Sequence, residues 1–132
     1  EIEMQNGHPV LLKMVAAVDC GVVVNLSGAY QQVKGGIIDG LGHALYGEVT
    51  LKDGVPDQKN FDTYRLIRMK EIPDVEVYFV DSAINPTGLG EPALPPAAAA
   101  LSNAFFKATG KRIYNQPFMR EEAMKGVGFG VK

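Results

Sequence analysis

The segment from residue 27 to residue 46 combines a helical spacing of apolar residues with an unusual number of glycines. Ala29, Val33, Ile37, Leu41 and Ala44 recur every three or four positions, which predicts a helix over 27–46 with Asn25 or Ser27 as its N-cap. The glycines of this segment are Gly28, Gly35, Gly36, Gly40 and Gly42. Each costs about 1 kcal/mol relative to alanine in a helix interior, but glycine also permits close approach of another group. We therefore expect this helix to pack tightly against a sheet, a second helix or a ligand.

Strand patterns lie on both sides of the predicted helix. Residues 1–5 alternate apolar and polar side chains, Asn6-Gly7 is a turn sequence, and an apolar run follows over 9–21, which predicts a hairpin. A second hairpin is predicted around Asp53-Gly54. Val75, Val77 and Phe79 then alternate with less apolar residues, as in a half-buried strand.

A second helix is predicted to have Pro95-Pro96 in its first turn, because proline suits that position. Its apolar stripe contains Leu94, Ala98, Leu101, Phe105 and Ala108, and Gly110 can end it in the left-handed conformation. This order of elements predicts an α+β fold: a two-layer sandwich with a mostly antiparallel sheet and two helices on one face. After Pro117 the periodicity is lost, so we expect one domain over 1–118 and a flexible tail over 119–132.

Composition excludes several classes of function. The 132 residues carry a net charge of −2 without a basic stripe, so a nucleic-acid partner is not expected. A single cysteine, Cys20, excludes an internal disulfide, and two separated histidines give no metal-ligand spacing, so no metal-binding side chains are predicted. Neither a membrane span nor a signal peptide is recognisable, and the compartment is left open.

Glu91 lies in the sequence Gly88-Leu89-Gly90-Glu91-Pro92, directly before the second predicted helix. The glycines permit unusual backbone angles and close approach to a ligand, and Pro92 restricts Glu91 to extended conformations. A carboxylate held in this way suits a general base. The alternative is an acidic residue near a helix start, favoured only by the helix dipole.

The first predicted helix carries Gln31-Gln32-Val33-Lys34-Gly35-Gly36. A glutamine amide offers donors and an acceptor to a heterocycle or a phosphate, and Gly35-Gly36 leave space beside it. The alternative is a pair of solvated glutamines on a helix that packs closely against the sheet.

Taken together, these strings resemble a known family. The segments "VDCGVVVN", "QQVKGGIIDGLGHALYGEVTLKDG", "NFDTYRLIRM", "VEVYFVDS" and "GLGEPALPPAAAALSNAFFKATGKRI" resemble, in order and spacing, the C-terminal part of the molybdenum-binding subunit of the xanthine dehydrogenase and aldehyde oxidase family. The resemblance covers about residues 1–118 and is strongest to the branch of the isoquinoline 1-oxidoreductase beta subunits. Lys34 stands where the family motif usually has glutamate.

The resemblance implies a hydroxylation that uses water-derived oxygen on an aldehyde or an N-heterocycle. Glu91 matches the family's general base, which takes a proton from a hydroxide on molybdenum before the oxygen attacks an electron-poor carbon. Gln32, Gly35 and Gly36 would lie beside a molybdopterin-type cofactor, and Gly88, Leu89 and Gly90 would form the loop next to the metal. Electrons would leave through iron–sulfur clusters on a partner subunit or domain, such as a 2Fe–2S small subunit.

Family subunits are several times longer, so the resemblance also implies upstream domains that complete the cofactor site and the substrate pocket. On this interpretation the 132-residue chain alone is not expected to be active. The alternative is a free-standing interaction or scaffold domain, derived from such a subunit and without catalytic function.

Overall fold

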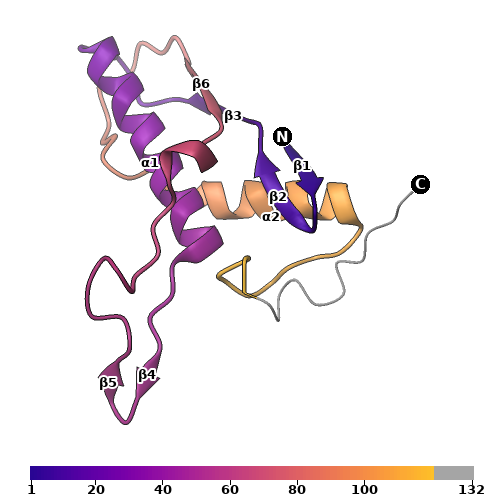
Figure 1. Cartoon of the computed structure of the whole chain (residues 1–132). Coiled ribbons are helices and arrows are strands. Elements are labelled where there is room, and N and C mark those ends of the chain that lie inside the picture. Colours follow the sequence, from indigo (N-terminus) through magenta and orange to yellow (C-terminus); the bar gives the residue numbers. More distant parts are fainter. Residues whose placement is uncertain (121–132) are drawn as a thin grey trace.

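The computed structural model describes residues 1–120, which contain six strands, two α-helices and one short 3-10 helix (Figure 1). The strands are β1 (Ile2–Gln5), β2 (His8–Leu11), β3 (Lys13–Val18), β4 (Leu51–Lys52), β5 (Val55–Pro56) and β6 (Asp74–Phe79). The helices are α1 (Leu26–Tyr46), η1 (Met69–Glu71) and α2 (Pro95–Thr109). No helix within residues 1–120 is both long and apolar enough to cross a membrane.

Helix α1 begins one residue before the predicted start and ends at the predicted residue. The Asn25 side chain accepts a hydrogen bond from the Gly28 N–H at 3.0 Å, so Asn25 is the N-cap of the two candidates. The predicted apolar stripe is the buried face of the helix. The local sequence therefore fixes both the extent of α1 and its rotation about its axis.

The α+β class is confirmed, and two of the three strand pairs, β1–β2 and β4–β5, are antiparallel hairpins. One feature differs from the prediction: the strands of the described chain form three separate pairs and not one sheet. The apolar run after Asn6-Gly7 is divided at Leu12, and its second part, β3, pairs in parallel with β6. A parallel pair needs a long crossover, which α1 and the β4–β5 hairpin supply.

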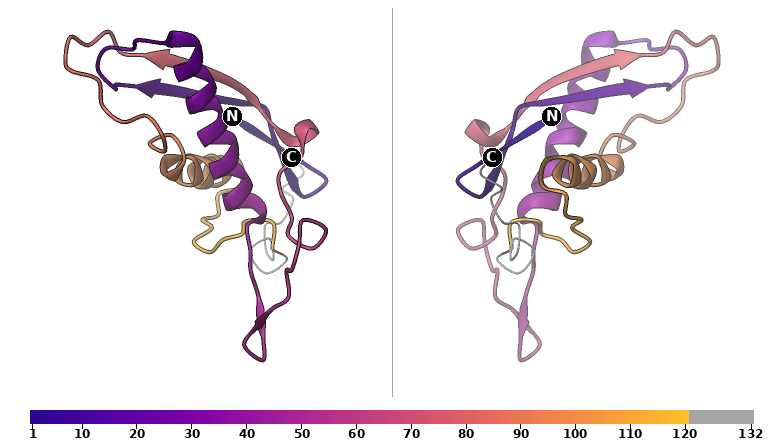
Figure 2. Two further views of the ribbon diagram at one scale, coloured as in Figure 1. Left: turned by 90° about the vertical axis from the view of Figure 1, so that its left-hand side faces the viewer. Right: turned by 90° about the vertical axis from the view of Figure 1, so that its right-hand side faces the viewer.

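The two helices pack on one side of the β3–β6 pair, which forms the second layer (Figure 2). Val75 and Val77 of β6 enter the same core as Val33 of α1 and Phe105 of α2. The opposite face of the strands is open, with Tyr78 57% exposed. The predicted placement of both helices on one face is thus present, and it brings the start of α2 against the middle of α1.

Two glycines of α1 permit this contact. A Cβ added at Gly40 would lie 2.5 Å from the Leu94 carbonyl oxygen and 2.9 Å from the Ala97 Cβ. At Gly36 the added Cβ would lie 3.3 Å from the Ala93 Cβ. The tight packing predicted for the glycine-rich helix is therefore packing against a second helix, and this packing offsets part of the glycine cost.

The end of α2 also follows the prediction, since Gly110 ends the helix with a φ of 73°. Downstream, Phe118 is buried and its N–H donates to the Ala44 carbonyl at 2.8 Å. Within the predicted flexible tail, the Met119 N–H donates to the Leu45 carbonyl at 3.1 Å and Arg120 pairs with Glu48. The rest of that predicted tail, residues 121–132, lies outside the described residues.

A cluster around Glu71 fastens the segment before β6 to the end of α1. Glu71 accepts hydrogen bonds from the Tyr46 hydroxyl at 2.8 Å, from Arg65 at 2.6 Å and from the Arg68 N–H at 2.7 Å. The Arg65 guanidinium also stacks 4.0 Å from the centre of the Tyr46 ring. Burial acts to raise the pKa of Glu71, but these hydrogen bonds and the Arg65 charge outweigh it and lower the pKa.

Glu71→Gln is expected to lower the free energy of unfolding at neutral pH by about 2 kcal/mol, because hydrogen bonds to a charged group are lost. Since the folded-state pKa is lowered, the ionised carboxylate stabilises the fold above the unfolded pKa of about 4.3. That contribution is lost as the pH falls through the folded pKa. Thermal unfolding of the purified protein at several pH values checks both effects. Glu76→Gln is the control because it removes only exposed contacts, an ion pair with Lys13 and a hydrogen bond from the Tyr78 hydroxyl. An equal loss in both variants would contradict the account.

Candidate functional site

Glu91 lies on an exposed loop that leads into α2. The Glu91 carbonyl accepts a hydrogen bond from the Leu94 N–H at 3.0 Å, which forms a turn before the helix begins at Pro95. Within residues 1–120, the Glu91 carboxylate forms no hydrogen bond or ion pair. It is therefore available to a bound molecule, as a general base requires.

The structure joins the two motifs that the sequence singled out. The Gln32 side-chain Nε2 on α1 donates a hydrogen bond of 2.6 Å to the carbonyl oxygen of Gly90. The bond brings Gln32 next to the residue that precedes Glu91, although 58 positions separate Gln32 from Gly90 in the chain. The predicted site residues Gln32, Gly90 and Glu91 form one group.

The predicted glycines divide into two kinds. A Cβ added at Gly35, Gly88 or Gly90 would meet no atom within 4 Å. Gly36, in contrast, faces Ala93 in the turn just before α2, so its lack of a side chain serves packing against that turn. Gly35, Gly88 and Gly90 present bare backbone at the surface, where a ligand can approach closely.

A second loop supports the one that carries Glu91. The Thr87 N–H donates to the Cys20 carbonyl at 2.9 Å, and the Val22 N–H donates to the Ile84 carbonyl at 3.1 Å. Gly21 between them has a φ of 70°, and a Cβ there would lie 2.4 Å from the Asn85 carbonyl oxygen. The 20–22 segment therefore depends on glycine, a requirement that the sequence analysis missed and that "DCG" after an apolar strand could have signalled.

A groove of about 280 Å³ lies between these loops and the first turns of α1. Gln32 and Leu89 line it together with residues of the 20–25 segment, which are mostly apolar. Cys20 also lines this groove and is buried, with only 5% of its surface exposed.

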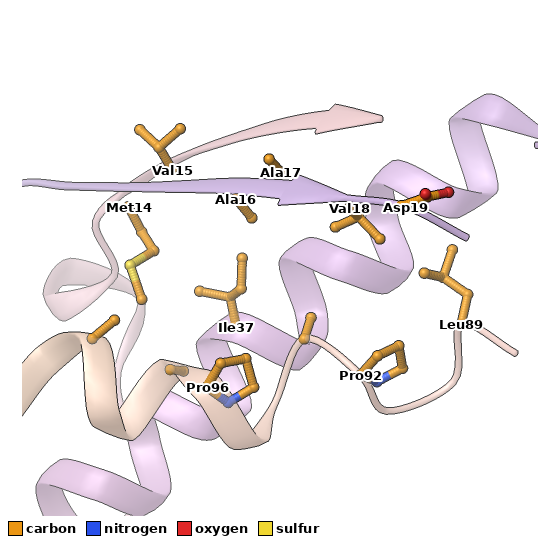
Figure 3. A pocket seen from close by; sticks show the side chains of 13 residues that line it. Met14, Val15, Ala16, Ala17, Val18, Asp19, Ile37, Leu89, Pro92 and Pro96 are labelled. Atoms are coloured by element: carbon orange, nitrogen blue, oxygen red, sulfur yellow. The ribbon is translucent and has the colours of Figure 1, made fainter. Parts of the chain in front are cut away.

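An apolar pocket of about 390 Å³ shares Leu89 with this groove (Figure 3). Met14, Ala16 and Val18 of β3 point into it, toward Ile37 of α1 and Pro96 of α2, whereas Val15 and Ala17 point away. Leu89 and Pro92 close the end nearest Glu91. Sequence reasoning did not place β3 near the site, because its position depends on the pairing with β6.

No group of three or more His, Cys, Asp or Glu side chains within residues 1–120 is arranged to hold a metal ion. His43 pairs with Asp39 of its own helix at 3.6 Å and lies apart from the Glu91 loop in the sequence. A metal at this site would therefore need ligands from outside the described residues, such as those of an organic cofactor.

Comparison with solved structures gives the fold. A crystal structure of a Cu,Mo-CO dehydrogenase in its carbon monoxide reduced state superposes with a TM-score of 0.79 and 21% identity, covering 98% of this chain and 18% of that chain. Among curated proteins, the isoquinoline 1-oxidoreductase subunit beta of Brevundimonas diminuta is 35% identical over 76% of this chain and 13% of its own length. A membrane-bound aldehyde dehydrogenase (pyrroloquinoline-quinone) of Gluconacetobacter polyoxogenes is 30% identical over 98% of this chain and 17% of its own length.

The chain thus spans less than a fifth of the length of these relatives, 17% of one and 13% of the other. The family model for the molybdopterin cofactor-binding domain matches residues 1–73, which include β1 to β3, all of α1 and Gln32. This chain belongs to the molybdopterin cofactor-binding domain family, in agreement with the resemblance of its motifs to molybdenum-binding subunits of xanthine and aldehyde dehydrogenases.

Proposed function

We propose that this domain acts within a molybdenum hydroxylase, with Glu91 as the general base for the hydroxylation of an aldehyde or an N-heterocycle by water-derived oxygen. The observation that carries the proposal is the position of Glu91. Its carboxylate has no recorded partner among the described residues, and Gln32 holds its loop against the helix that the cofactor-domain match includes. A base that is held in place but unpaired is ready to accept a proton.

The residues of the site fit a molybdopterin-type cofactor. Gly35, Gly88 and Gly90 leave room for a flat ring or a phosphate to approach the backbone. The N–H groups of Leu89, Gly90 and Glu91 donate no hydrogen bond to another backbone group within residues 1–120. These donors are therefore free to bind a ligand. Gln32 retains its amide oxygen as an acceptor. These groups would hold the cofactor, together with Gly36, which follows Gly35 on α1.

The chemistry then divides between cofactor and protein. When bound, the molybdenum cofactor would supply the oxidation of the substrate carbon. Glu91 would accept the proton released as the water-derived oxygen attacks that carbon, and the loop would keep its carboxylate within reach.

The proposal includes partners. Upstream domains would complete the cofactor site and the substrate pocket, since the relatives extend far beyond the matched region. A subunit or domain with iron–sulfur clusters, such as a 2Fe–2S small subunit, would carry the electrons away.

Cofactor analysis of the purified natural protein tests the proposal. We expect about one molybdenum per chain together with a pterin that is released on denaturation. One relative carries pyrroloquinoline quinone in its name, so the quinone is measured in the same sample. A protein that holds the quinone and no molybdenum would contradict the proposal.

A further inference from the structure

We propose that Gln32 is a positioning residue for Glu91: its amide fixes the Gly90 peptide and so sets the direction of the carboxylate in the next residue. This inference rests on the proposed function and goes beyond a contact between Gln32 and the cofactor. It is carried by the hydrogen bond of 2.6 Å between the Gln32 Nε2 and the Gly90 carbonyl oxygen.

The chemistry of the bond fixes the orientation of the amide. A carbonyl oxygen can only accept a hydrogen bond, so the nitrogen of the Gln32 amide must face Gly90. A glutamate or a methionine of similar size has no donor at this position at neutral pH. The bond therefore requires glutamine and not merely a long side chain.

The position of the bond makes it effective. The loop is fastened upstream by the Thr87 N–H to the Cys20 carbonyl and downstream by the Leu94 N–H to the Glu91 carbonyl. Between these two points, the Gln32 bond is the one recorded hydrogen bond from α1 to the loop within residues 1–120. Gly88 and Gly90 allow a wide range of backbone angles. Loss of this bond would therefore let the peptide between Gly90 and Glu91 change its orientation.

The effect should appear in catalysis and not in folding, because Gln32 is exposed. Gln32→Met in the complete loaded enzyme is expected to lower kcat by about 10- to 100-fold, as small misplacements of catalytic groups do, with little change in KM. The rates are taken per bound molybdenum, so that loss of the cofactor contact proposed for the Gln32 amide oxygen does not enter kcat, and the thermal midpoint should stay at the wild-type value. Gln31→Met is the matched control: it makes the same change one residue earlier, on an exposed side chain that forms no hydrogen bond within residues 1–120.

A double-variant cycle with Glu91→Gln separates positioning from other roles. Acetaldehyde and isoquinoline serve as substrates, with an artificial electron acceptor, and the rates are expressed per bound molybdenum. If Gln32 acts through Glu91, Gln32→Met has almost no further effect once Glu91→Gln is present. Gln32→Glu, which turns a carboxylate toward the Gly90 carbonyl, should impair kcat at least as much as Gln32→Met.

The possible failures are distinguishable. An equal fold-loss from Gln32→Met in both backgrounds, with rates expressed per bound molybdenum, would overturn the positioning role and leave Glu91 as the base. Wild-type kcat in Gln32→Met and Gln32→Glu would do the same. High activity of Glu91→Gln alone would instead overturn the proposed function.

Discussion

Glu91→Gln in the complete enzyme is expected to lower turnover by about 10²- to 10⁴-fold, the usual contribution of a positioned general base. The amide is similar in size and can still accept or donate hydrogen bonds, but it cannot take up a proton at neutral pH. Because the wild-type side chain has no recorded partner among the described residues, the substitution should not disturb folding. Steady-state rates per bound molybdenum measure the loss.

The same carboxylate should give wild-type turnover a fall at acid pH, as the base becomes protonated. The Glu91→Gln variant should lack this acid limb in its residual activity. Glu91→Asp keeps the acid but shortens it by one methylene, so we expect an intermediate rate with the acid limb preserved. A flat acid side in the wild-type profile would contradict the assignment of Glu91 as the base.

Gly40→Ala should destabilise the protein by about 1–3 kcal/mol, as overpacking of a close contact does. The new methyl would lie 2.5 Å from the Leu94 carbonyl oxygen, which belongs to the backbone and cannot rotate away. Helix propensity alone would predict a gain of about 1 kcal/mol for this change, so the sign of the effect decides between packing and propensity.

Gly35→Ala is the matched control on the same helix, because a Cβ there would meet no atom within 4 Å. It should gain stability by up to about 1 kcal/mol. Thermal unfolding of both variants gives the comparison. Equal stabilisation by the two alanines would show that α1 and α2 do not approach as closely as described. A further expectation is that Gly40→Ala lowers turnover, because a displaced Leu94 moves the turn that contains Glu91.

The helices were the most predictable part of the fold. The apolar spacing of α1, the Asn25 cap and the left-handed Gly110 are determined by residues within a few positions of one another. The pairing of β3 with β6 was not predictable in this way, because it joins Lys13 to Asp74 across the whole of α1. An apolar run such as 9–21 does not reveal that it will divide at Leu12.

The site shows the same division. Glu91 and Gln32 were singled out from their neighbours and from a family resemblance, and the structure brings them together. The need for close approach at Gly36 and Gly40 was also predictable, but their partner, the start of α2, was not. The contribution of β3 to the apolar pocket could not be predicted, because the alternation of side chains along a strand does not show which elements pack against it.

The most direct test of the central claim is the rate at which substrate reduces the bound cofactor in a single turnover without an electron acceptor. This rate isolates the step that needs a base from the later departure of electrons. For Glu91→Gln with normal molybdenum content, we predict that the cofactor is reduced at least about 10²-fold more slowly than in the wild type. Reduction at the wild-type rate would contradict the claim that Glu91 is the general base of this site.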